Sequence, residues 1–234
     1  MASTRPLLQL LRPPNLFTVP GDPLCGALLA SHGVWSWRIL PAVIVSFGAY
    51  CAGLVINDLA DYSEDLRDRP NRPLPSGSVS RRTAVALAVF FIVAALAAAA
   101  CVNNALLMLA VVLLGEIFWY DLRAKKSAVI GPMAMGVCRG LSVLAGAVAI
   151  APPSQKALGA AAVITLYIAG VTALARTETR NPRIPPLIGS LIRGLLFIQA
   201  GFCVLAGGSG WAAALVLLAL WPASRLVASR FYAS

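Results

Sequence analysis

Charged residues are scarce in this chain of 234 residues, because Asp, Glu, Lys and Arg together make up only 12% of it. A typical soluble domain carries about 25%. Hydrophobic residues account for 59%, and the mean hydropathy is +0.80. So few charges cannot cover a water-facing surface, which argues against a disordered chain, a coiled coil and a conventional soluble enzyme. The composition instead predicts an integral membrane protein.

Histidine and paired cysteines are also lacking. His32 is the single histidine, so a His-based catalytic triad is not available. The five cysteines are scattered, with no CxxC and no Cys/His cluster, which excludes a recognisable zinc site or disulfide framework. The net charge of +10 is more typical of basic cytoplasmic loops near anionic lipid than of nucleic-acid binding. We therefore expect membrane lipid as a partner and no nucleic acid.

Eight segments are long and apolar enough to cross a bilayer, which needs about 20 residues per helix. The first contains Pro20, Asp22 and Pro23 and is the weakest. Together the eight segments predict one all-α domain over residues 1–234, a polytopic transmembrane helical bundle. The segments lie roughly at 15–31, 39–57, 84–102, 105–121, 131–150, 157–176, 186–206 and 211–228.

Loop charges predict the orientation of these spans. Lys and Arg cluster at both termini and in the loops after the second, fourth and sixth spans, whereas the opposite loops hold only Arg38 and Lys156. The positive-inside rule then puts both termini and the long loops in the cytoplasm. We expect a multi-pass protein of a bacterial plasma membrane. Two cations, Arg139 and Arg193, lie inside spans; they either snorkel or, as we favour, face a shared anion-binding cavity.

Acidic residues concentrate just after the second span. Five of the nine fall between positions 58 and 68, and four of them recur at helical spacing along one face. They are Asp58, Asp61, Glu64, Asp65 and Asp68. This stripe is either a solvated helix end, neutralised by neighbouring arginines, or a Mg²⁺ site to which Asn57 adds a neutral oxygen. In a chain so poor in acid we favour the Mg²⁺ site.

A proline-rich loop follows at residues 69–77, with three prolines in six residues. It is either a rigid basic turn or a clamp that presents Arg69 and Arg72 to a diphosphate, since the guanidinium fork matches phosphate oxygens. The run Asn57-Asp58-x-x-Asp61-x-x-x-Asp65, followed by Arg69-Pro-x-Arg72-Pro-Leu-Pro-Ser-Gly, resembles the first aspartate-rich motif of the UbiA-type intramembrane prenyltransferases. Segments 131–141 and 167–178 look closer to the EboC-like branch of that superfamily.

The resemblance implies a helical bundle with a central cavity open toward the cytoplasm. There an isoprenyl diphosphate binds through Mg²⁺, and its prenyl group passes to a small acceptor that is aromatic or a lipid. By this likeness the metal ligands are Asn57, Asp58, Asp61 and Asp65, and Arg72 and Arg69 contact phosphate. Tyr120 and Lys125, in the loop after the fourth span, match a diphosphate-binding pair, although their spacing is one residue longer than usual. The alternative interpretation is that Tyr120 is an interfacial aromatic residue and Lys125 is a loop cation.

The chain departs from the family pattern in two places. The second aspartate motif is replaced by one carboxylate, Glu178, which is a metal ligand, an acid or base, or a partner of Arg176 or Arg180. The family usually has nine helices, so either the last helix is absent or the broken first span is miscounted.

The favoured function is prenyl transfer, in which Asp58, Asp61, Arg72, Lys125 and Glu178 act at the reacting diphosphate, and Arg139 and Arg193 help to bind it. No residue stands out in the sequence as a base for the acceptor. The alternative is a protein that binds or transports a prenylated lipid without chemistry.

Overall fold

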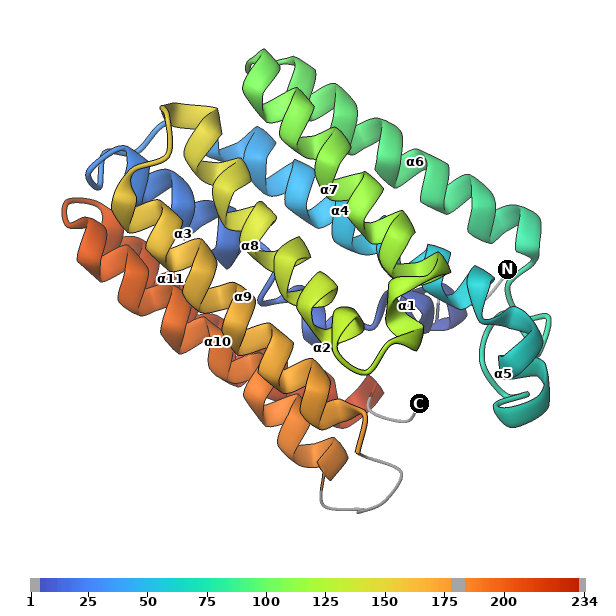
Figure 1. Ribbon diagram of the computed structural model, residues 1–234. Coiled ribbons are helices and arrows are strands. Elements are labelled where there is room, and N and C mark those ends of the chain that lie inside the picture. Colours follow the sequence, from blue (N-terminus) through green and yellow to red (C-terminus); the bar gives the residue numbers. More distant parts are fainter. Residues whose placement is uncertain (1–4, 178–183, 232–234) are drawn as a thin grey trace.

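The structure, a computed structural model, describes residues 5–177 and 184–231, and every regular element in these ranges is a helix (Figure 1). The predicted all-α class is therefore confirmed. In chain order the helices are α1 (Arg5–Leu11), α2 (Pro13–Leu16), α3 (Gly21–Ala30), α4 (Ile39–Ala60), α5 (Tyr62–Asp68), α6 (Arg81–Ala100), α7 (Asn104–Leu122), the 3₁₀ turn η1 (Ala124–Lys126), α8 (Ile130–Ile150), α9 (Gln155–Ala175), α10 (Ile184–Ala206) and α11 (Gly210–Phe231).

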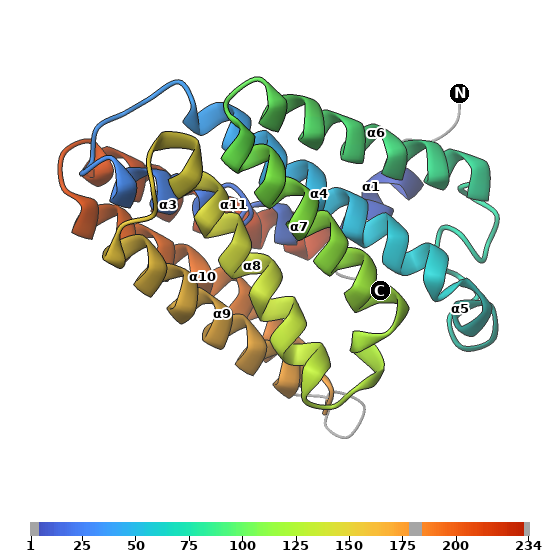
Figure 2. The same cartoon turned by 45° about the horizontal axis from the view of Figure 1, so that its top comes forward.

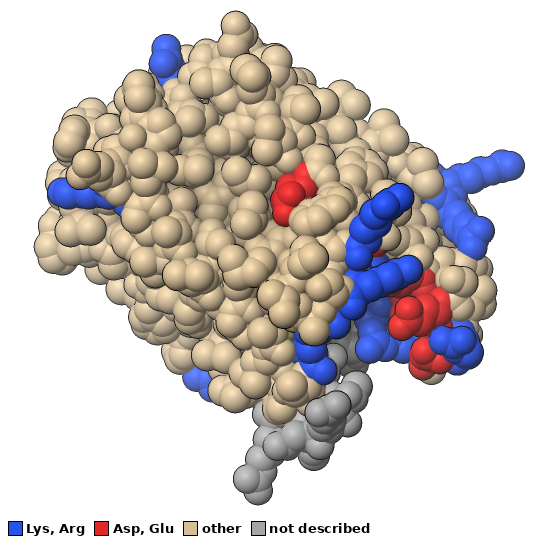
Figure 3. All heavy atoms as spheres, viewed as in Figure 1, with Lys and Arg blue, Asp and Glu red and all other residues tan. Residues whose placement is uncertain are grey.

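Seven of these helices, α4 and α6 to α11, are long and apolar enough to cross a membrane. In Figures 1 and 2, α4, α6 and α7 lie on one side of the bundle and α9, α10 and α11 on the other, with α8 between them. Figure 3 shows a broad face almost free of charge, while most of the charged side chains in view gather near α5 and the end of α7. The chain is thus a multi-pass integral membrane protein with one strongly charged end.

The predicted first span is wrong as a complete crossing. The four-residue α2 ends at Leu16, and α3 begins only after Pro20, which lies inside the predicted span. Arg12, just before α2, has a left-handed backbone with φ 46°. α3 has 10 residues, about 15 Å at 1.5 Å per residue, which is half of a hydrocarbon core. The count of full-length spans among the described residues is therefore seven rather than eight.

Small residues let this half-length helix enter the bundle. α3 is buried along most of its length and packs against α8 and α10. A Cβ atom added at Gly26 would overlap the backbone of Val143 in α8, and one added at Gly146 of α8 would overlap the backbone of Pro23. Close backbone approach at such positions is typical of helix packing in membranes. α3 thereby forms an inner wall of the bundle.

The acidic stripe lies where α4 gives way to α5. The helical hydrogen bonds continue through the junction, since Asp61 N donates to Asn57 O and Asp65 N donates to Asp61 O. After α5, the proline loop is fixed by the buried side chains of Leu74 and Val79, which pack against α1, α4 and α6. The loop is thus held against the end of α4, as its prolines suggested.

The close contact between α3 and α8 predicts a stability difference between two glycines. We expect Gly146→Ala to lower the free energy of unfolding by about 1–3 kcal/mol, because the new methyl group overpacks the interface. Gly159→Ala is the matched control: this glycine lies within α9, and a Cβ there meets nothing within 4 Å. It should be neutral or stabilising, since alanine favours a helix. SDS titration followed by circular dichroism measures both, and equal stabilities would contradict the packing described here.

Candidate active site

A cavity of about 450 Å³ lies between α4, α7, α8, α9 and α10. Its walls include apolar side chains from all five helices, namely Leu54, Leu113, Ile117, Met135, Ile168 and Ile192. Toward the charged end of the bundle its lining becomes polar, with Asn57, Tyr120 and Asp121. Ser46 lies three turns of α4 away from Asn57, so the cavity reaches well into the apolar part of the bundle.

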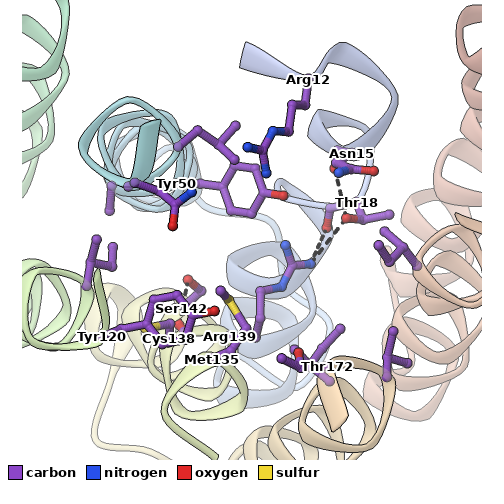
Figure 4. Close-up of a pocket in the computed structure, with 18 of the residues that line it drawn as sticks. Arg12, Asn15, Thr18, Tyr50, Tyr120, Met135, Cys138, Arg139, Ser142 and Thr172 are labelled. Atoms are coloured by element: carbon purple, nitrogen blue, oxygen red, sulfur yellow. Dashed lines mark hydrogen bonds between the residues drawn. The ribbon is translucent and has the colours of Figure 1, made fainter. Parts of the chain in front are cut away.

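A second group of polar residues lines this cavity deeper in the bundle. Figure 4 shows the Tyr50 ring between the side chains of Arg12 and Arg139, with the Arg139 guanidinium directed toward Thr18. Arg139 Nη2 donates to the Thr18 carbonyl at 2.9 Å, and Arg139 Nε lies 2.6 Å from Asp22 Oδ2. The cavity therefore has a buried, paired charge within the apolar bundle.

The Arg139 pair belongs to a network that joins three elements. Gln199 of α10 donates to Asp22 Oδ1 at 2.6 Å and to the Thr18 carbonyl at 2.8 Å. Asp22 and Gln199 are fully buried, and Arg139 is almost so. A buried charge is costly unless it is paired, so this network pins the broken first helix to α8 and α10.

Each carboxylate of the aspartate motif that the sequence assigns to a metal pairs with a cation from another part of the chain. The contacts are Arg12 Nη2 to Asp58 Oδ1 at 2.9 Å, Arg72 Nη1 to Asp65 Oδ2 at 2.8 Å, and Lys125 Nζ to Asp61 Oδ1 at 2.5 Å. The side chains of Asp58 and Asp65 are only 8% and 6% exposed, and that of Asp61 is 27% exposed. These carboxylates are therefore not a solvated helix end. Asp68, by contrast, is exposed and pairs with Arg67.

Lys125 occupies a central place in this arrangement. Its ammonium also donates to Asn57 Oδ1 at 3.3 Å, so two oxygens of the aspartate motif converge on one positive charge. Arg176, at the end of α9, donates to the Lys125 carbonyl at 2.9 Å and ties η1 to α9. Across the described ranges, no three His, Cys, Asp or Glu side chains lie close enough together to form a metal site on their own.

The structure brings together only part of the predicted site. Asn57 and Tyr120 line the cavity, and Arg72 and Lys125 reach the aspartate motif, whereas Arg69 is exposed. Arg139 lines this cavity, but the structure does not place Arg193 beside it, so a cavity shared by both stays a prediction. Arg193 is not among the lining residues and donates instead to Ser190 on an exposed part of α10.

Three residues of the site were not predicted. Arg12 was predicted only as one of the cations near the N-terminus. Asp22 was noted only because it interrupts the apolar sequence of the first span. Asp121 is 3% exposed and lines the cavity. For both aspartates the available signal was an acidic residue inside a predicted apolar span, in a chain that has few acidic residues. Glu178 lies outside the described residues, so its role stays a prediction.

The model of the UbiA prenyltransferase family matches residues 23–232. The chain belongs to this family. Among curated relatives, the digeranylgeranylglyceryl phosphate synthase of Thermococcus gammatolerans is 31% identical over 62% of this chain and 53% of its own length. That of Methanothermobacter thermautotrophicus is 33% identical over 62% of this chain and 51% of its own length. The matches thus span about half the length of these relatives.

Solved UbiA structures share the fold at low identity. A UbiA homologue from Aeropyrum pernix K1 has a TM-score of 0.59 at 22% identity, with 91% of this chain and 88% of that chain covered. A UbiA homologue from Archaeoglobus fulgidus bound to GPP and Mg²⁺ has a TM-score of 0.60 at 16% identity, with 96% and 87% covered. The bundle therefore has the UbiA fold. The EboC-like assignment stays a prediction, as does the bacterial membrane.

The buried network makes a prediction about Asp22. We expect Asp22→Ala to lower the free energy of unfolding by about 3–5 kcal/mol, because it leaves the Arg139 guanidinium buried without its counter-charge. Asp68→Ala is the control. The hydrogen bond from Arg67 lowers the pKa of Asp68, but both side chains are exposed and screened, so its loss should leave stability unchanged. If SDS titration gives both variants the stability of the wild type, Asp22 does not stabilise the bundle.

Proposed function

We propose that this chain transfers an isoprenyl group from an isoprenyl diphosphate to the hydroxyl group of a lipid acceptor, in a Mg²⁺-dependent reaction. One observation carries the proposal: three cations converge on the aspartate motif at the polar end of a largely apolar cavity. Such a cavity suits a ligand with a strongly anionic head and an isoprenoid tail. We treat residues 1–234 as one domain that performs this reaction.

The donor set at the motif fits a magnesium ion. Asn57 and Asp61 already share one cationic partner, the Lys125 ammonium. Mg²⁺ usually takes one or two protein carboxylates and completes its coordination with water and substrate phosphate, so a three-carboxylate cluster is not required. We assign Asn57, Asp58, Asp61 and Asp65 as the residues that hold it, together with Glu178. When bound, the ion neutralises negative charge that develops on the departing diphosphate.

The chain's own residues complete the site. Arg12, Arg72 and Lys125 already stand against the motif, and we propose that they turn to the phosphate oxygens when the donor binds. The apolar walls, such as Leu54 and Ile117, enclose the prenyl chain and keep water from the allylic cation. We place this polar end on the cytoplasmic side, in line with the cations that gather there in Figure 3.

Two observations bear on the acceptor and on the rival function. The curated relatives are named for making digeranylgeranylglyceryl phosphate, which favours a glyceryl phosphate lipid over an aromatic acceptor. The internal pairing of each motif carboxylate favours the alternative, a protein that binds a prenylated lipid without turnover. One assay can determine both which acceptor is used and whether the protein transfers the prenyl group at all.

The assay uses purified protein in liposomes with radiolabelled geranylgeranyl diphosphate and Mg²⁺. We expect labelled product with geranylgeranylglyceryl phosphate, little with 4-hydroxybenzoate, and none after EDTA treatment or in the Asp58→Ala/Asp61→Ala double variant. Asp68→Ala, in the same stripe but exposed, should be as active as the wild type. Donor binding without product from any acceptor would support the binding role, and full activity of the double variant would overturn the metal assignment.

Lys125 offers a separate test of donor binding. Removing its charge eliminates a charge-assisted hydrogen bond of about 1.5–3 kcal/mol. We therefore expect Lys125→Gln to raise the Kd of geranylgeranyl diphosphate by about 10- to 100-fold, as measured by isothermal titration calorimetry with Mg²⁺ present. The neighbouring Lys126 is exposed, so Lys126→Gln removes the same charge away from the motif and should leave the Kd unchanged. Equal effects of the two variants would show that Lys125 acts only through net charge.

A further inference from the structure

Asp121, near the end of α7, has no assigned part in the reaction although its position is unusual. It is 3% exposed, yet it lines the cavity together with Tyr120 and Asn57. Among the described lining residues it is the one carboxylate, because Asp22, Asp58, Asp61 and Asp65 lie outside the lining. Asp121 is therefore the described carboxylate that a substrate in the cavity can contact directly, without a metal ion between them.

Asp121 also differs from the other buried acids in its partners. Within residues 5–177 and 184–231, Asp22, Asp58, Asp61 and Asp65 each have an ion pair. Asp121 has neither an ion pair nor a hydrogen bond to its carboxylate oxygens. Its charged neighbours are Lys125, Asp61, Arg12 and Asp58. Their charges are engaged with one another, so the Asp121 oxygens stay free to accept a proton.

Prenyl transfer creates a need for such a group. As the allylic carbon of the donor loses its bond to the diphosphate, the electron pair of that bond leaves with the diphosphate. The acceptor oxygen then bonds to this carbon and becomes positively charged unless it gives up its proton. A general base within hydrogen-bond reach must take that proton, and either an oxygen of the departing diphosphate or a side chain that lines the cavity can supply it.

We infer that Asp121 is the general base that takes this proton. One Asp121 oxygen accepts the proton of the acceptor hydroxyl while the new C–O bond forms, and the neutral carboxylic acid returns the proton to water after the products leave. This assignment rests on the proposed function and adds a catalytic residue to it. Asp121 stands at the polar end of the cavity, where the diphosphate head of the donor and hence its allylic carbon are expected.

The test separates donor binding from transfer. Wild type, Asp121→Asn and Glu116→Gln are compared with radiolabelled geranylgeranyl diphosphate, geranylgeranylglyceryl phosphate and Mg²⁺ under single-turnover conditions, and the Kd of the donor is measured in parallel. Glu116 is the matched control, because it is an acid on the same helix that does not line the cavity. We expect Asp121→Asn to lose about 100-fold or more of the transfer rate with its donor Kd within about threefold of wild type. Glu116→Gln should match the wild type in both.

Chemical rescue distinguishes a base from a structural residue. Asp121→Gly leaves room for a small carboxylate, so added sodium formate should restore transfer at least tenfold, whereas chloride should not. A loss of donor binding in Asp121→Asn would overturn the inference and assign Asp121 to the metal or diphosphate. Unchanged transfer, or no rescue by formate, would overturn it as well. Absence of product from the wild type would overturn the proposed function itself, and this assignment with it.

Discussion

The constraint on which this structure depends is the need to neutralise carboxylates at the end of a transmembrane helix. Asp58 and Asp65 are buried and Asp61 is half-buried beside an apolar cavity, where unpaired charge is costly. The three cations that neutralise them come from three separate segments: Arg12 from the turn between α1 and α2, Arg72 from the proline loop and Lys125 from η1. The aspartate motif therefore gathers these segments around one end of the cavity.

A further ion pair orders the same cavity from another side. Asp22 and Arg139 meet among apolar helices, and Gln199 completes their hydrogen bonding to the Thr18 turn. Because the prolines of the first segment prevent a full span, the backbone at Thr18 needs partners inside the bundle. The pair supplies one of them, so the helix break and the buried arginine depend on each other.

The parts of this architecture that follow from local pattern could be predicted, and those that follow from tertiary contact could not. Long apolar runs identified the seven full-length helices. The acid-rich stripe pointed to Asn57, the proline loop to Arg72 and the family resemblance to Lys125. The ion-pair partner of each charged residue could not be predicted, because Arg12 lies 46 residues from Asp58 in the sequence and Arg139 lies more than 100 from Asp22. The same limit applies to Arg193: its position along the span could be read from the sequence, but the side of the helix that it occupies depends on how α10 packs.

The most direct measurement is a structure with a thiodiphosphate analogue of the donor and Mn²⁺ in place of Mg²⁺, located by anomalous diffraction. The account predicts a metal about 2.1 Å from oxygens of Asp61 and at least one other motif residue, with the Lys125 ammonium moved from Asp61 to a phosphate oxygen. A metal bound elsewhere, with Lys125 still paired to Asp61, would contradict it.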